Sequence, residues 1–138
     1  MTRTISIALA AAMLALVPAS ATAAPPNARA ITGPTAKYYG YVTPVVVIQK
    51  GQGITYTNID IERHNVVQDV NADGFHGSST RPWCKQFPAG RCPIFYSPLI
   101  GLGGSENVKG LKYVKPGKVY TFYCTLHPGM KGRLVVAP

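Results

Sequence analysis

A thiol, an imidazole and a thioether lie within seven residues near the C-terminus, in the run Cys124-Thr125-Leu126-His127-Pro128-Gly129-Met130. Thiolate and thioether are soft ligands that suit Cu(I), and imidazole suits both copper valences. Two His and one Cys in a plane, with a long axial Met, are typical of a blue-copper centre. The run supplies three of these four ligands, so the fold has to bring a distant His to it.

The chain has three His in all, which leaves His64 and His76 as candidates for the missing ligand. His64 begins an expected strand, whereas His76 lies in a Gly-containing loop that no strand orients. A His at one strand end and a Cys at another can meet at one pole of a sandwich, and we therefore expect His64 to be the ligand. Two alternatives stay open: His64 as an ordinary strand histidine, and Met130 as an ordinary turn residue.

The N-terminus has the pattern of a secretory signal peptide over residues 1–23. Arg3 provides a charged start, Ile5 to Val17 carries no charge, and Ala21-Thr22-Ala23 is a plausible cleavage site, with Ala19-Ser20-Ala21 as its rival. The apolar stretch is shorter than the roughly 20 residues of a spanning helix, although an uncleaved anchor is the alternative. We expect export to the periplasm or the cell exterior, and no membrane span in the mature chain.

Cleavage would leave 115 of the 138 residues, enough for one domain with a single core. Removing Arg3 lowers the formal charge from +9 to +8. The basic residues are scattered singly, without a cluster interleaved with aromatics, so we do not expect nucleic-acid binding. The charge favours either solubility alone or attraction to an acidic protein partner.

Cysteine usage fits an exported protein. Cys84 and Cys92 enclose a short Pro/Gly-containing loop, and outside the cytosol we expect them to form a disulfide. Cys124 then remains unpaired, and metal ligation would protect its thiol. The competing interpretation is a second metal site made by the two loop cysteines, with or without His76.

Short apolar or alternating runs separated by turn motifs predict an all-β sandwich or barrel of about seven or eight strands. Residues 24–36 are small and Pro-rich and predict a flexible lead-in to a domain over 37–138. A long loop that contains the Cys pair forms an insertion at 69–98. The expected strands cover residues 45–48, 54–58, the start at 64–67, 108–114, 119–124 and 134–136, with turns at 50–53 and 115–118. The first turn predicts a hairpin or a hairpin-like corner.

The chain resembles the cupredoxins, the plastocyanin/azurin family of small blue-copper proteins, and its ligand loop is most similar to that of amicyanin. The resemblance covers about residues 38–137, apart from the insertion at 69–98, and implies a Greek-key β-fold. The matching segments are Lys50 to Asn58, His64-Asn65-Val66-Val67, Lys115-Pro116-Gly117-Lys118 and Tyr123 to Gly132.

This resemblance implies one type 1 copper ion with His64, Cys124 and His127 as equatorial ligands and Met130 as the axial ligand. It also implies that Asn65 braces the ligand loop through Thr125, a role that fixes ligand orientation. Where the family often has Pro, this chain has Leu126, and we hypothesise that the Leu126 N–H donates to the Cys124 sulfur and raises the reduction potential.

The implied function is one-electron transfer between redox proteins, by a monomer whose partners have an acidic docking surface. The edge of His127 is expected to be accessible within an apolar rim. An enzyme is not expected, because a second copper centre would need more His than the chain has. The alternative is an extracytoplasmic copper-binding, storage or delivery protein that lacks fast electron exchange.

Overall fold

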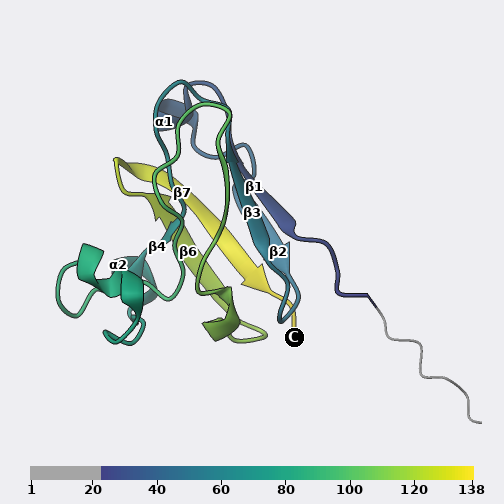
Figure 1. The fold of residues 1–138 in the computed structure, drawn as a ribbon, viewed down its shortest axis with the longest axis vertical. Helices are drawn as coiled ribbons and strands as arrows, with labels where there is room; N and C mark the ends of the chain where they lie inside the picture. The colour runs from purple at the N-terminus through teal and green to yellow at the C-terminus, as the bar shows by residue number, and fades with distance from the viewer. Residues whose placement is uncertain (1–22) are drawn as a thin grey trace, which may run out of the picture.

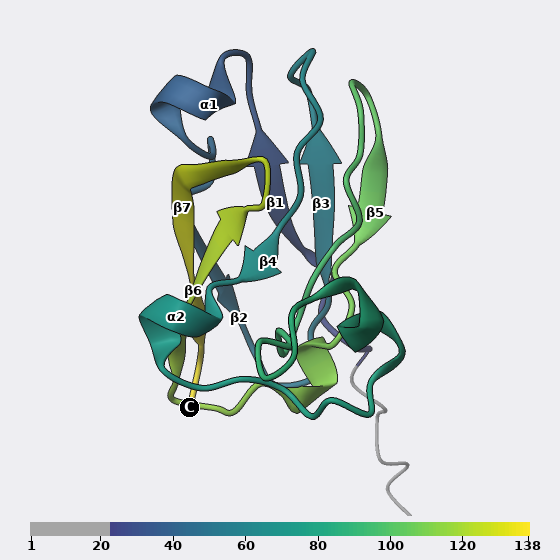
Figure 2. The same cartoon turned by 90° about the vertical axis from the view of Figure 1, so that its left-hand side faces the viewer.

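Two β-sheets packed face to face form the body of the protein (Figures 1 and 2). The computed structural model describes residues 23–138, and the predicted signal peptide lies, except for its last residue, outside the described residues. One sheet has the strand order β1-β3-β5 and the other has the order β2-β7-β6-β4. The expected all-β sandwich is therefore confirmed.

The elements are short, and the connections between them are long. In chain order they are β1 (Ala28–Thr32), α1 (Ala36–Tyr39), β2 (Val45–Ile48), β3 (Ile54–Asn58), β4 (Val67–Gln68), α2 (Val70–Asp73), the 3₁₀ helix η1 (Pro82–Gln86), β5 (Ser105–Asn107), the 3₁₀ helix η2 (Leu111–Tyr113), β6 (Val119–Cys124) and β7 (His127–Val136). β1 pairs parallel with β3, and β2 pairs parallel with β7. The remaining pairs, β3 with β5, β4 with β6 and β6 with β7, are antiparallel.

Alternation of side chains along the strands builds one core between the sheets. In β6, Tyr120, Phe122 and Cys124 are buried while the intervening residues are not, as the period of two predicts. Tyr56 of β3 and Leu134 of β7 join the same buried cluster from the two sheets. Cys124 is thus the last inward-facing residue of a core strand, which fixes its position.

Two expectations about individual segments need correction. Residues 28–32, expected in a flexible lead-in, form β1, because β3 offers them a complete parallel partner. Residues 108–114, expected as a strand, contain η2 instead, and the strand β5 precedes them. Of the two alternatives for the turn after β2, the structure has the corner, because β2 and β3 belong to different sheets.

The insertion at 69–98 folds back on itself and is closed by a disulfide between Cys84 and Cys92, as predicted, with 4.9 Å between their α-carbons. The insertion lies beside the sheet that contains β4 and β6 (Figure 2). Among residues 23–138, no helix has the length and apolar character needed to cross a membrane.

Candidate metal centre

The turn between β6 and β7 brings a thiol and an imidazole to one end of the sandwich. Cys124 ends β6, His127 begins β7, and the two residues pair across the turn formed by Thr125 and Leu126. The ladder is irregular between Tyr123 and Cys124, where it bends at the tip. The Cys124 side chain is fully buried, whereas the His127 side chain keeps 20% of its surface exposed.

His64 reaches the same place from a segment sixty residues earlier in the chain. Its backbone exchanges two hydrogen bonds with Ile100, of 3.2 and 2.9 Å, in an isolated bridge. The imidazole is completely buried. The N–H and the carbonyl of His64 are thus both bonded to Ile100, which fixes the backbone, and burial leaves the ring little space to turn. The ligand candidate is therefore in place before any metal binds.

The three donor atoms converge. Cys124 Sγ lies 3.6 Å from His64 Nδ1 and 3.6 Å from His127 Nδ1, and the two Nδ1 atoms are 3.2 Å apart. Donor atoms that share one ion at about 2.0–2.3 Å are separated from one another by about 3–4 Å. A thiolate and two imidazoles therefore already stand in the arrangement that one copper ion requires. Within the described residues, these three side chains form the one such His/Cys/Asp/Glu group.

Met130 lies on β7, three residues after His127, and is buried to 99%. Its position in the hairpin of β6 and β7 places it in the same core cluster as Cys124. A thioether is a soft ligand that suits Cu(I). Of the four residues predicted from the sequence, the donor atoms of His64, Cys124 and His127 converge, and Met130 shares the buried core cluster with Cys124.

Two carboxylates, which our sequence analysis did not single out, contact the outer nitrogens of the two imidazoles. Asp60 Oδ2 lies 2.9 Å from His64 Nε2 and also accepts a 3.0 Å hydrogen bond from the Ala36 N–H. Burial alone would raise the pKa of Asp60, but these hydrogen bonds outweigh it and hold the pKa below its ordinary value. Asp60 is therefore an anion at neutral pH that fixes the His64 ring with Nδ1 toward the thiol.

Glu62 plays the corresponding part at the exposed ring. Its Oε2 lies 2.9 Å from His127 Nε2, and its other oxygen pairs with Lys37 of α1. The bond from Lys37 is the main cause of the lowered pKa of Glu62. The solvent edge of His127 consequently faces an ion pair as well as the neighbouring Leu126, whose side chain is 53% exposed. The rim is less apolar than we expected.

Asn65 connects the His64 segment to the ligand turn. Its Oδ1 accepts a 2.9 Å hydrogen bond from the Thr125 N–H, and its Nδ2 donates to Thr125 Oγ1 at 3.0 Å. The Asn65 carbonyl in turn accepts from the buried Tyr41 hydroxyl. These bonds close the turn onto the His64 segment, so that two distant parts of the chain are joined next to the donor atoms.

The hypothesis about Leu126 stays a prediction. Among the hydrogen bonds of residues 23–138 there is none from the Leu126 N–H to Cys124 Sγ. The competing idea of a second metal site is also excluded, because Cys84 and Cys92 are oxidised to a disulfide. His76 is exposed, and its Nδ1 lies 2.8 Å from the Gly77 carbonyl.

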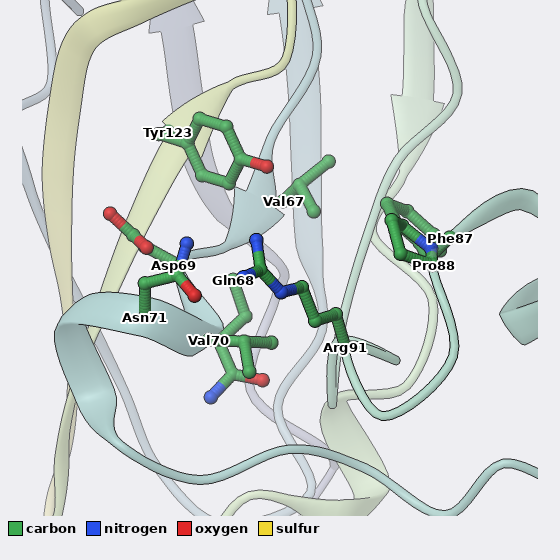
Figure 3. A pocket seen from close by; sticks show the side chains of 9 residues that line it. All are labelled: Val67, Gln68, Asp69, Val70, Asn71, Phe87, Pro88, Arg91 and Tyr123. Atoms are coloured by element: carbon green, nitrogen blue, oxygen red, sulfur yellow. The ribbon is translucent and has the colours of Figure 1, made fainter.

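A small hollow of about 110 Å³ separates part of the insertion from β4 and from Tyr123 of β6 (Figure 3). Arg91 reaches into it from the insertion, toward Asp69 and Tyr123. Burial raises the pKa of Tyr123, and the negative charges of Asp69 and of Cys124 add to the effect. The space suits a few water molecules and not an organic ligand, so this contact is a packing interface beside the residue that precedes Cys124.

Comparison with known proteins agrees with the geometry. The model of the family described as "Copper binding proteins, plastocyanin/azurin family" matches residues 29–137. Similar solved structures include a purple cupredoxin from Nitrosopumilus maritimus, with a TM-score of 0.55 and 23% identity over 80% of this chain and 100% of that one. A reduced amicyanin variant aligns with a TM-score of 0.53 and 21% identity, over 86% of this chain and 89% of its own. An oxidised amicyanin variant aligns with a TM-score of 0.54 and 21% identity, also over 86% of this chain and 89% of its own. A comparison with curated proteins returns no match.

Proposed function

The chain belongs to the plastocyanin/azurin family of copper-binding proteins, and on that basis we propose that it is a one-electron carrier. It is a cupredoxin whose His, Cys, His and Met residues are typical of a type 1 copper site. In this proposal His64, Cys124 and His127 are the equatorial ligands and Met130 is the axial one. Bound copper would supply the Cu(II)/Cu(I) couple, and no bond would be made or broken in a substrate.

The observation that carries the proposal is the preformed arrangement of the three donor atoms, 3.2–3.6 Å apart. Each donor is fixed by a different constraint: Cys124 by its strand, His64 by Asp60 and the Ile100 bridge, and His127 by Glu62. Ligands that cannot rearrange present the same environment to both copper valences. Little atomic movement then accompanies a change of one electron, which is what a carrier needs.

His127 offers the route for the electron. It is the one exposed member of the three donor residues, since Cys124 and His64 are fully buried. A partner that docks over this end would meet the imidazole edge, the Lys37–Glu62 pair and the exposed side chains of Leu126 and Ile61. Contacts of this kind are small and short-lived in electron-transfer complexes. The positive charge of the chain supports an acidic redox protein as the partner.

We also propose an extracytoplasmic location, for which the Cys84–Cys92 disulfide and the N-terminal sequence pattern are the support. Residues 1–23 are the proposed signal peptide and the remainder is the proposed mature protein.

Copper loading followed by electrochemistry tests the function. The purified mature protein should take up one Cu(II), turn intensely blue or purple, and give a reversible one-electron wave in voltammetry. Cys124→Ser should remove the colour, whereas His76→Ala should retain both colour and wave. Copper uptake without colour, or with an irreversible wave and ready loss to a chelator, would favour storage or delivery and contradict the proposal.

A further inference from the structure

The insertion at 69–98 builds a second hollow that the copper chemistry does not use. This hollow lies between the segment 75–81 of the insertion and the segment 113–120, which runs from η2 into β6. Its space of about 450 Å³ falls in the range of small-molecule sites, about 300–1,000 Å³. Its floor is Tyr120, whereas Cys124 lies four residues further along the same strand, roughly 13 Å away.

Three cations line this hollow, and within the part of the chain that the structure describes none of them has an acidic partner. Arg81, Lys115 and Lys118 belong to the lining, which contains no Asp or Glu. None of the ion pairs formed within residues 23–138 includes any of the three. Like charges concentrated in a concave site attract an anion more strongly than the same charges on a convex surface.

Arg81 is held in a definite position. Its guanidinium carbon lies 3.9 Å from the centroid of the Tyr113 ring, and its Nη1 donates a 3.2 Å hydrogen bond to the Ile94 carbonyl. Gly77 packs so closely against this guanidinium that a side chain there would collide with it. Partial burial lowers the pKa of Arg81 from its ordinary value, yet guanidinium stays cationic at neutral pH. The remaining N–H groups are a preorganised set of donors for an oxyanion.

Aromatic rings and one further donor complete the walls. Phe75 packs edge-on against Tyr120, with 5.6 Å between the ring centroids, and Tyr113 also belongs to the lining. The buried Tyr120 oxygen accepts a 2.8 Å hydrogen bond from the Lys115 N–H. Its own hydroxyl proton has no acceptor among the hydrogen bonds of the described residues, and so stays free to donate to a ligand.

The insertion holds this wall rigid. The Gly77 N–H donates to the Cys92 carbonyl at 2.6 Å, and the Trp83 indole donates to the Pro93 carbonyl at 3.0 Å. The disulfide closes the same loop. The segment that carries Arg81 is thus tied to residues 92–94 at several points. These contacts and the disulfide hold the wall of the hollow in place.

We propose that this hollow binds a small organic anion, namely a flat apolar group that carries a phosphate or a carboxylate. The oxyanion lies against Arg81, Lys115 and Lys118, and the flat group lies among Phe75, Tyr113 and Tyr120. The proposal does not depend on electron transfer, since none of these residues is a ligand candidate.

Titration of the copper-loaded protein with phenyl phosphate, at fixed ionic strength and followed by amide NMR, tests the site. We expect saturable shifts confined to residues 75–81 and 113–120. The affinity should be at least tenfold higher than for inorganic phosphate, which lacks the ring, or for phenol, which lacks the charge. Equal affinity for inorganic phosphate, or shifts spread over all surface lysines, would overturn the proposal.

Two double variants of equal charge separate a built site from a general effect of the positive chain. The double variant Lys115→Gln and Lys118→Gln should lower the affinity for phenyl phosphate at least fivefold. Lys50 and Lys85 do not line the hollow, so the double variant Lys50→Gln and Lys85→Gln should change this affinity less than twofold. Arg81→Lys, which keeps the charge but loses the planar fork, should also weaken binding. Equal weakening by both double variants would contradict the site, and an unchanged amide spectrum elsewhere shows that each variant is folded.

Discussion

At the residue scale, one loop controls both imidazoles of the copper site. Asp60 and Glu62 are separated by a single residue, and each contacts the outer nitrogen of one ligand His. A carboxylate on that nitrogen fixes the ring orientation and makes the imidazole a stronger donor. Negative charge near the metal also favours Cu(II) over Cu(I), so these two residues should set part of the reduction potential.

Asp60→Asn should raise the potential. The amide keeps most of the shape but removes a buried charge, and one charge at several ångströms in a medium of intermediate dielectric corresponds to roughly 50–100 mV. Voltammetry of the copper-loaded variant measures the shift, with Glu106→Gln on β5 as a control that removes one exposed acid away from the site. A potential equal to or below that of the parent would show that the Asp60 charge does not reach the metal.

Glu62→Gln should also raise the potential, but by less than Asp60→Asn, because water and Lys37 screen the exposed carboxylate. Lys37→Gln should lower it slightly, since it removes the opposite charge from the same pair. Voltammetry at low and high salt checks both, and the two shifts should shrink as salt rises. Shifts of the same sign in the two variants would contradict this electrostatic account.

The sequence alone pointed to the candidate donor residues and to the Asn65–Thr125 contact, but not to the two carboxylates. Cys124, His127 and Met130 share one short run, and strand position favoured His64 over His76. Asp60 and Glu62 precede His64 in a loop, where spacing does not reveal which way a side chain points. Their roles follow from the backbone path that also brings Ala36 and Lys37 to them, and such long-range contacts have no local sequence pattern.

At the element scale, Asp69 connects α2 to the ligand hairpin. Its carboxylate accepts from the Ala72 N–H at the start of α2 and pairs with Lys131 of β7 at 2.9 Å. Burial alone would raise its pKa, but these partners lower it below the ordinary value. A lowered pKa in the folded state means that the carboxylate stabilises the fold at neutral pH.

Asp69→Ala should therefore reduce the free energy of unfolding by about 1–2 kcal/mol at pH 7. The stabilisation is complete above the pKa of an unfolded Asp and is lost as the pH falls through the lower pKa of the folded state. Denaturant unfolding from pH 7 to pH 2 should show the parent and the variant converging at low pH. Asp69→Asn, which can still cap the helix, should lose less stability at pH 7. A difference that stays constant with pH would exclude a role for the charge.

The disulfide of the insertion at 69–98 leads to a separate prediction. Replacing Cys84 and Cys92 together by Ser should lower the free energy of unfolding by about 2–3 kcal/mol, the value of a disulfide that closes a short loop. The colour of the copper-loaded variant should be unchanged, because the insertion contributes no donor atom. Chemical denaturation and a visible spectrum measure the two quantities. A changed spectrum would mean that the packing of Arg91 beside Tyr123 reaches the metal.

The strands show which elements a sequence can reveal. The alternation of Tyr120, Phe122 and Cys124 predicted β6 correctly, because every second side chain of a strand faces the core. β1 was missed, because its short run is stabilised by β3 far along the chain and not by its own composition. Residues 108–114 had the apolar content of a strand, but the segment buries Val108, Leu111 and Val114 around the short helix η2 instead.

At the scale of the whole molecule, the copper site exists only in the folded state. His64 and Cys124 are sixty residues apart, and the two sheets must assemble before their donor atoms meet. A ligand that binds only the folded protein shifts the unfolding equilibrium by mass action. Copper and the sandwich should therefore stabilise each other.

Adding one equivalent of copper should raise the thermal unfolding midpoint of the parent protein by roughly 10 °C or more. A tightly bound ligand contributes a few kcal/mol, which in a domain of this size corresponds to roughly 4–8 °C per kcal/mol. Calorimetry of Cys124→Ser, with and without copper, is the control and should show at most a small shift. An equal rise in parent and variant would mean that copper binds elsewhere.

The spacing of the three cysteines also affects which of them pair. Cys84 and Cys92 are eight residues apart, whereas Cys92 and Cys124 are 32 apart. In an unfolded chain, closure of the shorter loop is favoured roughly eightfold on chain statistics. Pairing of the two nearer thiols leaves Cys124 reduced, and the folded protein keeps its thiol buried. The disulfide thereby preserves the thiolate that a copper ion would need.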